Sequence, residues 1–296
     1  MLWLTSLLRL MSQVMLSNPI ELAIHKYLNS ITAKDTVLSK KVLKGIVKDI
    51  EVALNKQFVE KKNQDFTLRM SNIGRPYCQL WFDKNKPESA LPPSANFIIM
   101  MLIGDILEAV FKGLLTASGV SYKSGEQVEL DLGDGCKIPG TPDIIFDTGV
   151  ADIKSASPWS YQNKFKTYDT LAEKDSFGYI AQLAGYAEAT GTKPNGWWVI
   201  NKGTGEFKHV DSPNLNTKAV LAQTKQLYKE LKLNKFRRCF EDEPETYRKK
   251  PSGNRKLGKE CSWCAYRHAC WPGLKEMPSK VSQAENPPMV CYTEVR

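Results

Sequence analysis

The chain has 296 residues, 42% of them hydrophobic, which is enough to bury a core of ordinary size. Lysine and arginine outnumber aspartate and glutamate by 41 to 32, and the resulting net charge of +9 is compatible with a polyphosphate partner. The seven cysteines are odd in number and three of them crowd together, which argues against a secreted disulfide framework and for thiolates that bind a metal in a reducing compartment.

Residues 1–16 are apolar but lack the features of a targeting signal. Arg9 interrupts the run, no basic segment precedes it and no small-residue cleavage site follows. The run is also too short and too broken to span a bilayer. We expect either a helix packed on the body or a translated extension upstream of a start at Met11 or Met15, and no contact with a membrane.

Helical spacing predicts two helices in the first part of the chain. Apolar residues recur from Val37 to Leu54 with lysines between them. A second helix begins after Ser94, which can serve as its N-cap, and stops by Gly119. Most faces of this second helix are apolar, so we expect it to be buried. Three prolines between residues 84 and 94 predict a loop before it.

The middle of the chain alternates between strand and helix patterns. Three strands are expected at 126–132, 136–146 and 149–155, followed by a polar, aromatic loop over 158–175. A helix at 177–189, a hairpin of 197–201 and 206–210, and a long helix at 215–240 complete the series. This order predicts an α/β domain. We divide the chain into an N-terminal helical region (1–93), a core (94–240) and a basic tail (241–296) that packs back on the N-terminal region as one globular unit.

Two carboxylates and one amine define a candidate metal site. Asp143 and Asp152 lie on adjoining predicted strands across a tight turn, and Lys154 projects from the same strand face as Asp152. Hard oxygen ligands suit Mg²⁺ or Mn²⁺, and the carbonyl of Ile153 could add a further ligand. Such an ion polarises a phosphoryl oxygen and acidifies a water, while a lysine positions that water or offsets charge.

The cysteines define a second candidate site. Cys78 stands alone, and Cys261, Cys264 and Cys270 follow far along the chain as C-x2-C-x5-C. This spacing predicts one metal centre that holds the two ends of the chain together. A set of four cysteines suits either zinc or an iron–sulfur cluster, and the gap of five is less typical of zinc ribbons.

The remaining thiols are expected to be small buried or tail residues rather than ligands. These thiols are Cys136, Cys239 and Cys291. If one of the four assigned cysteines is wrong, Cys239 or Cys291 would replace it as a ligand.

Gly140-Thr141-Pro142-Asp143 followed by Asp152-Ile153-Lys154 resembles the PD-(D/E)XK nuclease superfamily, and the predicted element order matches that family's αβββαβ core. Gln182-x3-Tyr186 on the following helix is similar to a motif of the RecB-like branch. The four cysteines resemble those of iron–sulfur members of that branch, which include AddB-type recombination nucleases and CRISPR-associated single-strand exonucleases. The resemblance covers roughly residues 74–271.

The resemblance implies a restriction-endonuclease-like core, with a central mixed sheet flanked by helices, N-terminal helices and a C-terminal cysteine-cluster tail. It implies that Glu108 completes the metal site, with Asp105 as the competing candidate. Gln182 and Tyr186 would lie beside the catalytic centre and contact DNA. The cysteines would hold a [4Fe–4S] cluster. The chain departs from many relatives at Leu107, where they have a histidine ligand, and this leaves the number of metal ions open.

The expected function is therefore a Mg²⁺- or Mn²⁺-dependent DNA exonuclease that acts on single strands or ends and leaves a 5′-phosphate. Its setting would be repair, recombination, replication or phage DNA metabolism in a bacterial or phage-infected cytoplasm. No helicase motif is present, so any unwinding must come from a helicase or recombinase partner. The alternatives are a non-catalytic DNA-binding iron–sulfur subunit, a nuclease that trims precursors in CRISPR adaptation, and a zinc-stapled endonuclease.

A candidate DNA track lies just after the third predicted strand. Aromatic rings stack on bases and lysines attract phosphates, so the mixture of the two favours single-strand binding. Ordinary packing of some rings in the core is the alternative. The candidate residues are Trp159, Tyr161, Lys164 and Lys166.

Overall fold

The computed structural model describes residues 18–60 and 66–296, so the prediction for residues 1–16 lies outside the described residues. The fold is mixed α/β with three small sheets. The central sheet has the order β3-β4-β5-β6, formed by Ile144–Phe146, Gly149–Ala156, Pro194–Asn201 and Phe207–Val210. Strands β4 and β5 pair in parallel, and the two outer strands run antiparallel to their neighbours.

Two apolar cores lie on the two faces of this sheet. Successive residues of β5 point to opposite faces. Trp197 belongs to the core beneath α8 (Tyr179–Thr190), and Trp198 belongs to the core beneath α5 (Ala95–Ala117). Both tryptophans are fully buried. The sheet is thus buried on both sides, which accounts for the nearly continuous apolar run in β5.

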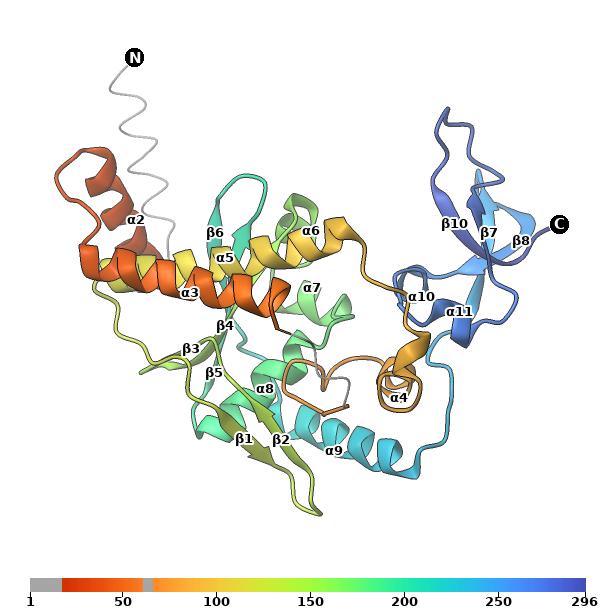
Figure 1. Ribbon diagram of the computed structural model, residues 1–296, viewed down its shortest axis with the longest axis horizontal. Coiled ribbons are helices and arrows are strands. Elements are labelled where there is room, and N and C mark those ends of the chain that lie inside the picture. The colour runs from red at the N-terminus through yellow and green to blue at the C-terminus, as the bar shows by residue number, and fades with distance from the viewer. Residues whose placement is uncertain (1–17, 61–65) are drawn as a thin grey trace.

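Other helices extend these two layers (Figure 1). Helices α2 (Pro19–Thr32) and α3 (Lys40–Phe58) contact α5, and α9 (Thr217–Leu233) contacts α8. The hairpin of β1 (Val128–Asp131) and β2 (Lys137–Gly140) also packs against α8.

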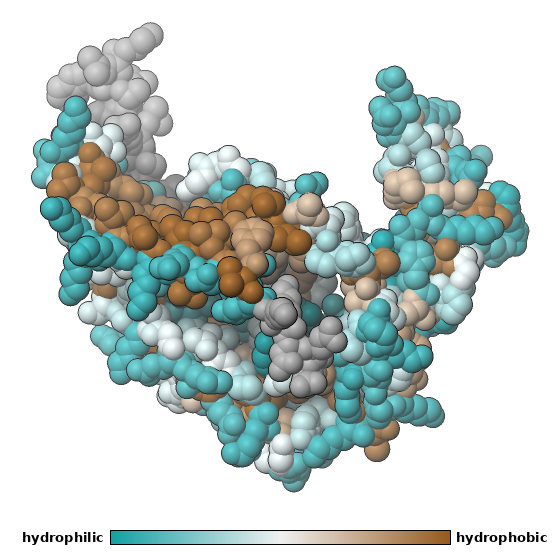
Figure 2. Space-filling view, in the orientation of Figure 1, coloured by the Kyte–Doolittle hydropathy of each residue, from teal (hydrophilic) through white to brown (hydrophobic). Residues whose placement is uncertain are grey.

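Ser94 caps α5 as predicted, since its hydroxyl accepts the backbone N–H of Phe97 at 3.2 Å. The prediction that the whole helix is buried was wrong. Its first turns expose Phe97, Ile99, Met100 and Met101, which continue an apolar band along α3 (Figure 2). Residues from Ala109 onward are the ones that enter the core.

Three boundaries differ from the prediction. The strand expected at 136–146 is split, because β2 pairs with β1 whereas β3 joins the central sheet. The loop expected at 158–175 contains two short helices, α6 (Pro158–Asn163) and α7 (Tyr168–Glu173), which are capped by Ser157 and Thr167. The last long helix ends at Leu233, where Asn234 takes a left-handed conformation with φ 56°.

The tail forms a separate four-stranded sheet of order β7-β8-β10-β9, which was not predicted. Its strands are Asp242–Tyr247, Lys250–Leu257, Met289–Glu294 and Lys275–Pro278. Short helices α10 (Lys259–Ser262) and α11 (Arg267–Cys270) lie between β8 and β9. This part of the tail meets α4 (Tyr77–Asn85) and the short 3-10 helix η1 (Pro87–Ser89) that follows it.

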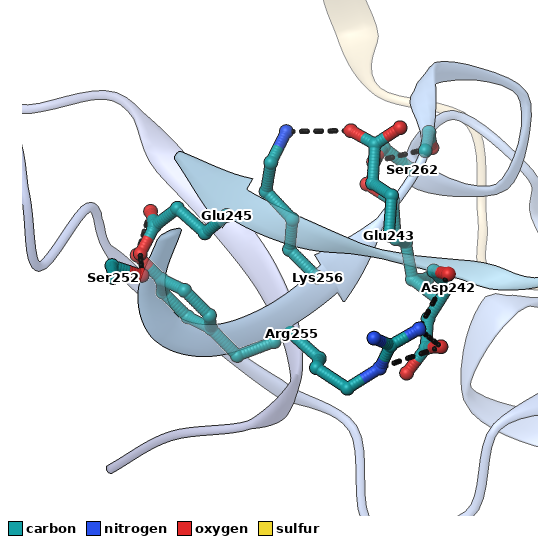
Figure 3. A network of polar contacts seen from close by, with 10 residues as sticks. Asp242, Glu243, Glu245, Ser252, Arg255, Lys256 and Ser262 are labelled. Carbon is teal, nitrogen blue, oxygen red and sulfur yellow. Dashed lines mark hydrogen bonds and ion pairs between the residues drawn. The ribbon is translucent and has the colours of Figure 1, made fainter. Parts of the chain in front are cut away.

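Polar contacts organise the tail sheet (Figure 3). Glu245 is 3% exposed and accepts hydrogen bonds from Asn254 at 2.7 Å, Tyr292 at 2.6 Å and Ser252 at 3.1 Å. Burial alone would raise the pKa of Glu245, but these three donors hold it below its usual range. Arg255 also pairs with Asp242.

The N-terminal helices divide their contacts between the core and the tail. Of the N-terminal elements, α2 and α3 lie against the core helix α5, and α4 is the one that meets the cysteine-bearing tail. Within residues 18–60 and 66–296, no helix is both long enough and apolar enough to cross a bilayer.

Candidate functional site

Asp143 and Asp152 face each other across two neighbouring strands. The register pairs Ile144 with Ala151, and one step further along the ladder brings Asp143 opposite Asp152. One carboxylate oxygen of Asp143 accepts the backbone N–H of Ile153 at 2.7 Å. The sheet therefore fixes the two acids as neighbours at one end of the β3–β4 pair.

Asp152 is the most unusual side chain of the site. It is 1% exposed, and within the described part of the chain Oδ1 has no hydrogen-bond partner and Oδ2 meets no donor other than the ammonium of Lys154. Its negative charge is balanced by the ammonium of Lys154, 2.5 Å from Oδ2. A buried carboxylate with unused lone pairs is costly unless something else binds it.

Lys154 links this pair to helix α8. Its ammonium donates a hydrogen bond to Oε1 of Gln182 at 3.2 Å and lies 5.0 Å from the ring centre of Tyr179. Burial alone would lower the pKa of Lys154, but the charges of Asp152 and Asp143 hold it above its usual range. The amine therefore stays charged at neutral pH.

The two carboxylates repel each other. Burial, together with the charge of Asp152, raises the pKa of Asp143 to about 7. Burial also raises the pKa of Glu108, with a further contribution from Asp143. Raised pKa values on neighbouring buried acids are a usual electrostatic mark of a site built for a cation or a proton transfer.

Helix α5 contributes Glu108 and a lysine. Glu108 Oε1 accepts a hydrogen bond from Lys112 at 2.7 Å, one turn further along the helix. Asp105, the competing candidate, accepts from Gln57 at 3.1 Å and pairs with Lys56 on α3, so it is engaged away from the site. Gly104 allows close contact with β4, since a methyl group there would lie 3.0 Å from Ser155 Oγ.

The oxygen donors fit a hard divalent cation in kind and in charge. Asp143 and Asp152 adjoin, and Oδ1 of Asp152 has no hydrogen-bond partner among the described residues. As the side chains stand in residues 18–60 and 66–296, no three His, Cys, Asp or Glu groups converge on one point. Glu108 is held by Lys112, so a shared ion would require Glu108 to exchange that partner for the metal.

Gln182 and Tyr186 lie on the inner face of α8, one turn apart. Gln182 reaches Lys154, as described above. Tyr186 is 3% exposed, and burial raises its pKa to about 12. Its ring also packs at Gly140, where an added methyl group would lie 2.9 Å from Cε1. Tyr186 belongs to the apolar core on this face of the sheet and supports the helix beneath Gln182, and its contact with DNA stays a prediction.

Four cysteines line a cavity at a second candidate site. Cys78 lies on α4, Cys261 and Cys270 on α10 and α11, and Cys264 between them, and all four line one cavity together with Phe82, Tyr266 and Trp271. The four thiols line this cavity together, and their chemistry fits a soft metal centre such as zinc or an iron–sulfur cluster.

The cavity is built from two segments far apart in the sequence, α4 and the tail. Tyr266 donates to Asp83 at 2.6 Å, and the backbone N–H of Leu91 donates to the carbonyl of Ala265 at 2.9 Å. Burial raises the pKa of Cys261 to about 11, with Cys264 and Cys270 adding to the effect.

The other thiols differ in their distance from this cavity. Cys239 accepts the backbone N–H of Cys78 at 3.0 Å, so it lies directly behind one of the four. Cys136 is fully buried in the core next to α8. Cys291 lies on β10 beside Arg267.

The predicted DNA track is rearranged by α6. Trp159 is 55% exposed, and the ammonium groups of Lys174 and Lys259 lie 5.8 Å and 5.2 Å from its ring centre. Lys166 is exposed, Lys164 is 7% exposed, and Tyr161 packs against the core as in the alternative reading.

Lys112 and Tyr179 belong to the site but were missed in the sequence. Lys112 follows Glu108 by four positions, which is the spacing of an ion pair on a helix. Tyr179 precedes Gln182 by less than one turn, so the same spacing argument could have placed it near Lys154.

Comparison with known proteins adds little. No family model matches the chain, and no curated protein matches it. Among solved structures, the crystal structure of SSO0001 is similar with 13% sequence identity, and the match covers 78% of this chain and 96% of that one. At a TM-score of 0.41, this likeness carries no argument about function.

Proposed function

We propose that the protein is a divalent-metal-dependent DNA nuclease of the PD-(D/E)XK type, acting as an exonuclease on single strands or ends. The observation that carries the proposal is Asp152, which is buried beside Asp143, contacts the ammonium of Lys154 through Oδ2 and has no hydrogen-bond partner for Oδ1 among the described residues. A stable fold gains nothing from such an arrangement, since an apolar residue would cost less there.

Asp143, Asp152 and Glu108, with the carbonyl of Ile153, would hold Mg²⁺ or Mn²⁺. When bound, such an ion supplies polarisation of a phosphoryl oxygen and a water of lowered pKa. Gln182 orients Lys154, whose permanent positive charge can hold the attacking water and offset the charge of the phosphorane-like transition state. Lys112 would favour the ionised form of Glu108 when no metal is bound, against the burial that raises its pKa.

The four cavity cysteines would hold an iron–sulfur cluster with a structural role, because they join α4 to the tail. The chemistry of the ligands alone leaves zinc as the other candidate. We place the protein in recombination, repair or replication of DNA, with unwinding supplied by a partner helicase or recombinase.

The test uses single-stranded DNA labelled at the 5′ or 3′ end, with circular single strands as controls, in the presence of Mg²⁺ or Mn²⁺. An exonuclease degrades the linear strands, spares the circles and releases 5′-phosphates. Cleavage of circles would indicate an endonuclease. Absence of metal-dependent cleavage, with DNA binding intact and equal for Asp152→Asn, would favour a non-catalytic DNA-binding subunit.

A further inference from the structure

Lys164 is a buried cation without an anionic partner. Lys164 is 7% exposed. Within residues 18–60 and 66–296, its ammonium forms neither a hydrogen bond nor an ion pair. Aromatic ring centres surround it instead, at 4.5 Å for Tyr179, 4.9 Å for Phe177 and 5.8 Å for Phe165. Rings offset only part of the cost of removing an ammonium from water.

The nearest acid does not serve as that partner. Asp175 caps α8, since its Oδ1 accepts the backbone N–H groups of Gly178 and Tyr179, and its Oδ2 accepts that of Ile180. The charge of Asp175 favours the ammonium of Lys164 from a distance, and the charges of Lys259 and Lys154 oppose it. The position is therefore positive and can accept a further anion.

An exposed ring lies beside this ammonium. Phe177 is 60% exposed, and it stacks on Tyr179 with ring centres 5.6 Å apart and planes 13° apart. Tyr179 in turn lies under the ammonium of Lys154, which touches Asp152. A continuous row thus leads from a solvent-exposed aromatic face to the catalytic amine.

We propose that Phe177 and Lys164 form a nucleotide subsite for single-stranded DNA, in which Phe177 stacks on an unpaired base and Lys164 binds the adjoining phosphate. This inference rests on the proposed nuclease function and specifies its substrate. Stacking requires a base whose face is free, which an internal base pair does not offer. The bound phosphate supplies the anion that Lys164 lacks, and the row of rings sets the strand beside Lys154.

The test measures binding of fluorescent oligothymidine to the Asp152→Asn protein, so that cleavage does not interfere. Phe177→Ala should weaken binding about 10-fold, as expected for one stacked base. Lys164→Met should weaken it to a similar extent and reduce the dependence of affinity on salt by about 0.7 of a logarithmic unit per decade. Lys164→Arg, which keeps the charge, should retain most of the binding.

Two control variants test whether removal of any exposed ring or lysine weakens DNA binding. Phe97→Ala removes a ring that is 56% exposed and has no described ammonium over it, and Lys193→Gln removes an exposed lysine at the start of β5. Both should bind like the parent protein. Lys164→Met should melt at the same temperature as the parent or higher, since it removes an unpaired buried charge. Duplex binding should change by less than about twofold in all variants.

The outcomes distinguish this inference from the proposed function. If the wild type cleaves DNA but Phe177→Ala and Lys164→Met bind single strands as the parent does, the subsite is wrong and the nuclease stands. If these variants lose binding while the wild type never cleaves, the subsite stands and the catalytic proposal fails. Equal losses in Phe97→Ala, or equal losses on duplex DNA, would also overturn the subsite.

Discussion

Gly74 and Gly178 pack backbone against backbone. A methyl group on Gly74 would lie 2.2 Å from the Cα atom of Gly178, and one on Gly178 would lie 2.3 Å from the Cα atom of Gly74. Gly74 precedes the helix that carries Cys78, and Gly178 is the N-cap of the helix that carries Gln182. The cysteine cavity and the candidate catalytic site are therefore joined through one close backbone contact.

Replacement of Gly74 by alanine should disturb both sites at once, because neither backbone can retreat without moving its helix. We expect a loss of about 2 kcal/mol or more in the free energy of unfolding, together with weaker metal binding at the cysteines. Gly45→Ala is the matched control, since nothing lies within 4 Å of its added methyl group in α3. That variant should gain up to about 1 kcal/mol. Equal stability of the two variants in urea denaturation would contradict the role of this contact.

The contribution of Asp143 to the stability of the metal-free protein should fall as the pH rises through the acidic to neutral range. Asp143 has a folded pKa of about 7 against an ordinary value of 3.8, so the folded state holds a proton that the unfolded state releases. The stabilisation is complete below about pH 4 and is lost by about pH 8, with a magnitude on the order of 2–4 kcal/mol.

Asp143→Asn has no such proton to lose. Relative to this variant, the unfolding free energy of the wild type should fall across this window, and the variant should be the more stable protein at pH 8. Added Mn²⁺ at pH 8 should stabilise the wild type and leave Asp143→Asn unchanged. Parallel pH profiles for the two proteins, measured by chemical denaturation, would show that Asp143 is not the titrating group.

Loss of a cavity cysteine should remove the metal centre. Cys264→Ser should release iron, abolish absorbance near roughly 400 nm and loosen the tail. Cys291→Ser is the control outside the cavity and should keep full colour. Cys239→Ser should also keep its colour but shift the spectrum, because its sulfur accepts the backbone N–H of the neighbouring Cys78. A colourless wild type that contains zinc would replace the cluster with the zinc alternative.

The tail sheet should depend on its buried carboxylate. Tyr292→Phe removes the donor 2.6 Å from Glu245 and should destabilise the tail by about 2 kcal/mol, as expected for a hydrogen bond to a charged group. Hydrogen exchange of β7, β8 and β10 should report the loss locally. Tyr228→Phe removes a more exposed hydroxyl that donates to the Gly135 carbonyl, and it should cost under about 1 kcal/mol. A uniform effect over the whole chain would contradict local control by Glu245.

The sequence was sufficient where a local signal is strong. The Ser94 cap and the helix after it are present, and the short turn between β3 and β4 predicts that Asp143 and Asp152 adjoin. The sequence was insufficient where tertiary contacts determine the secondary structure. The tail strands are rich in charged residues and show no apolar alternation, because Glu245 and its donors occupy their interior.

The segment after β4 shows the same limit. Helices α6 and α7 in this segment are too short to show a helical pattern of apolar residues. The burial of Lys164 between them could therefore not be predicted from the sequence. That burial depends on Phe177, which lies beyond both helices, and only the packing of α8 brings its ring over the ammonium.

The most direct test of the proposed activity is single-turnover cleavage of single-stranded DNA with Mn²⁺ by the wild type, Asp152→Asn and the exposed control Asp169→Asn. We predict that the wild type and Asp169→Asn cleave at similar rates, and that Asp152→Asn is slower by at least about 10³-fold, since a metal ligand is lost. Cleavage by Asp152→Asn at the wild-type rate would contradict the account.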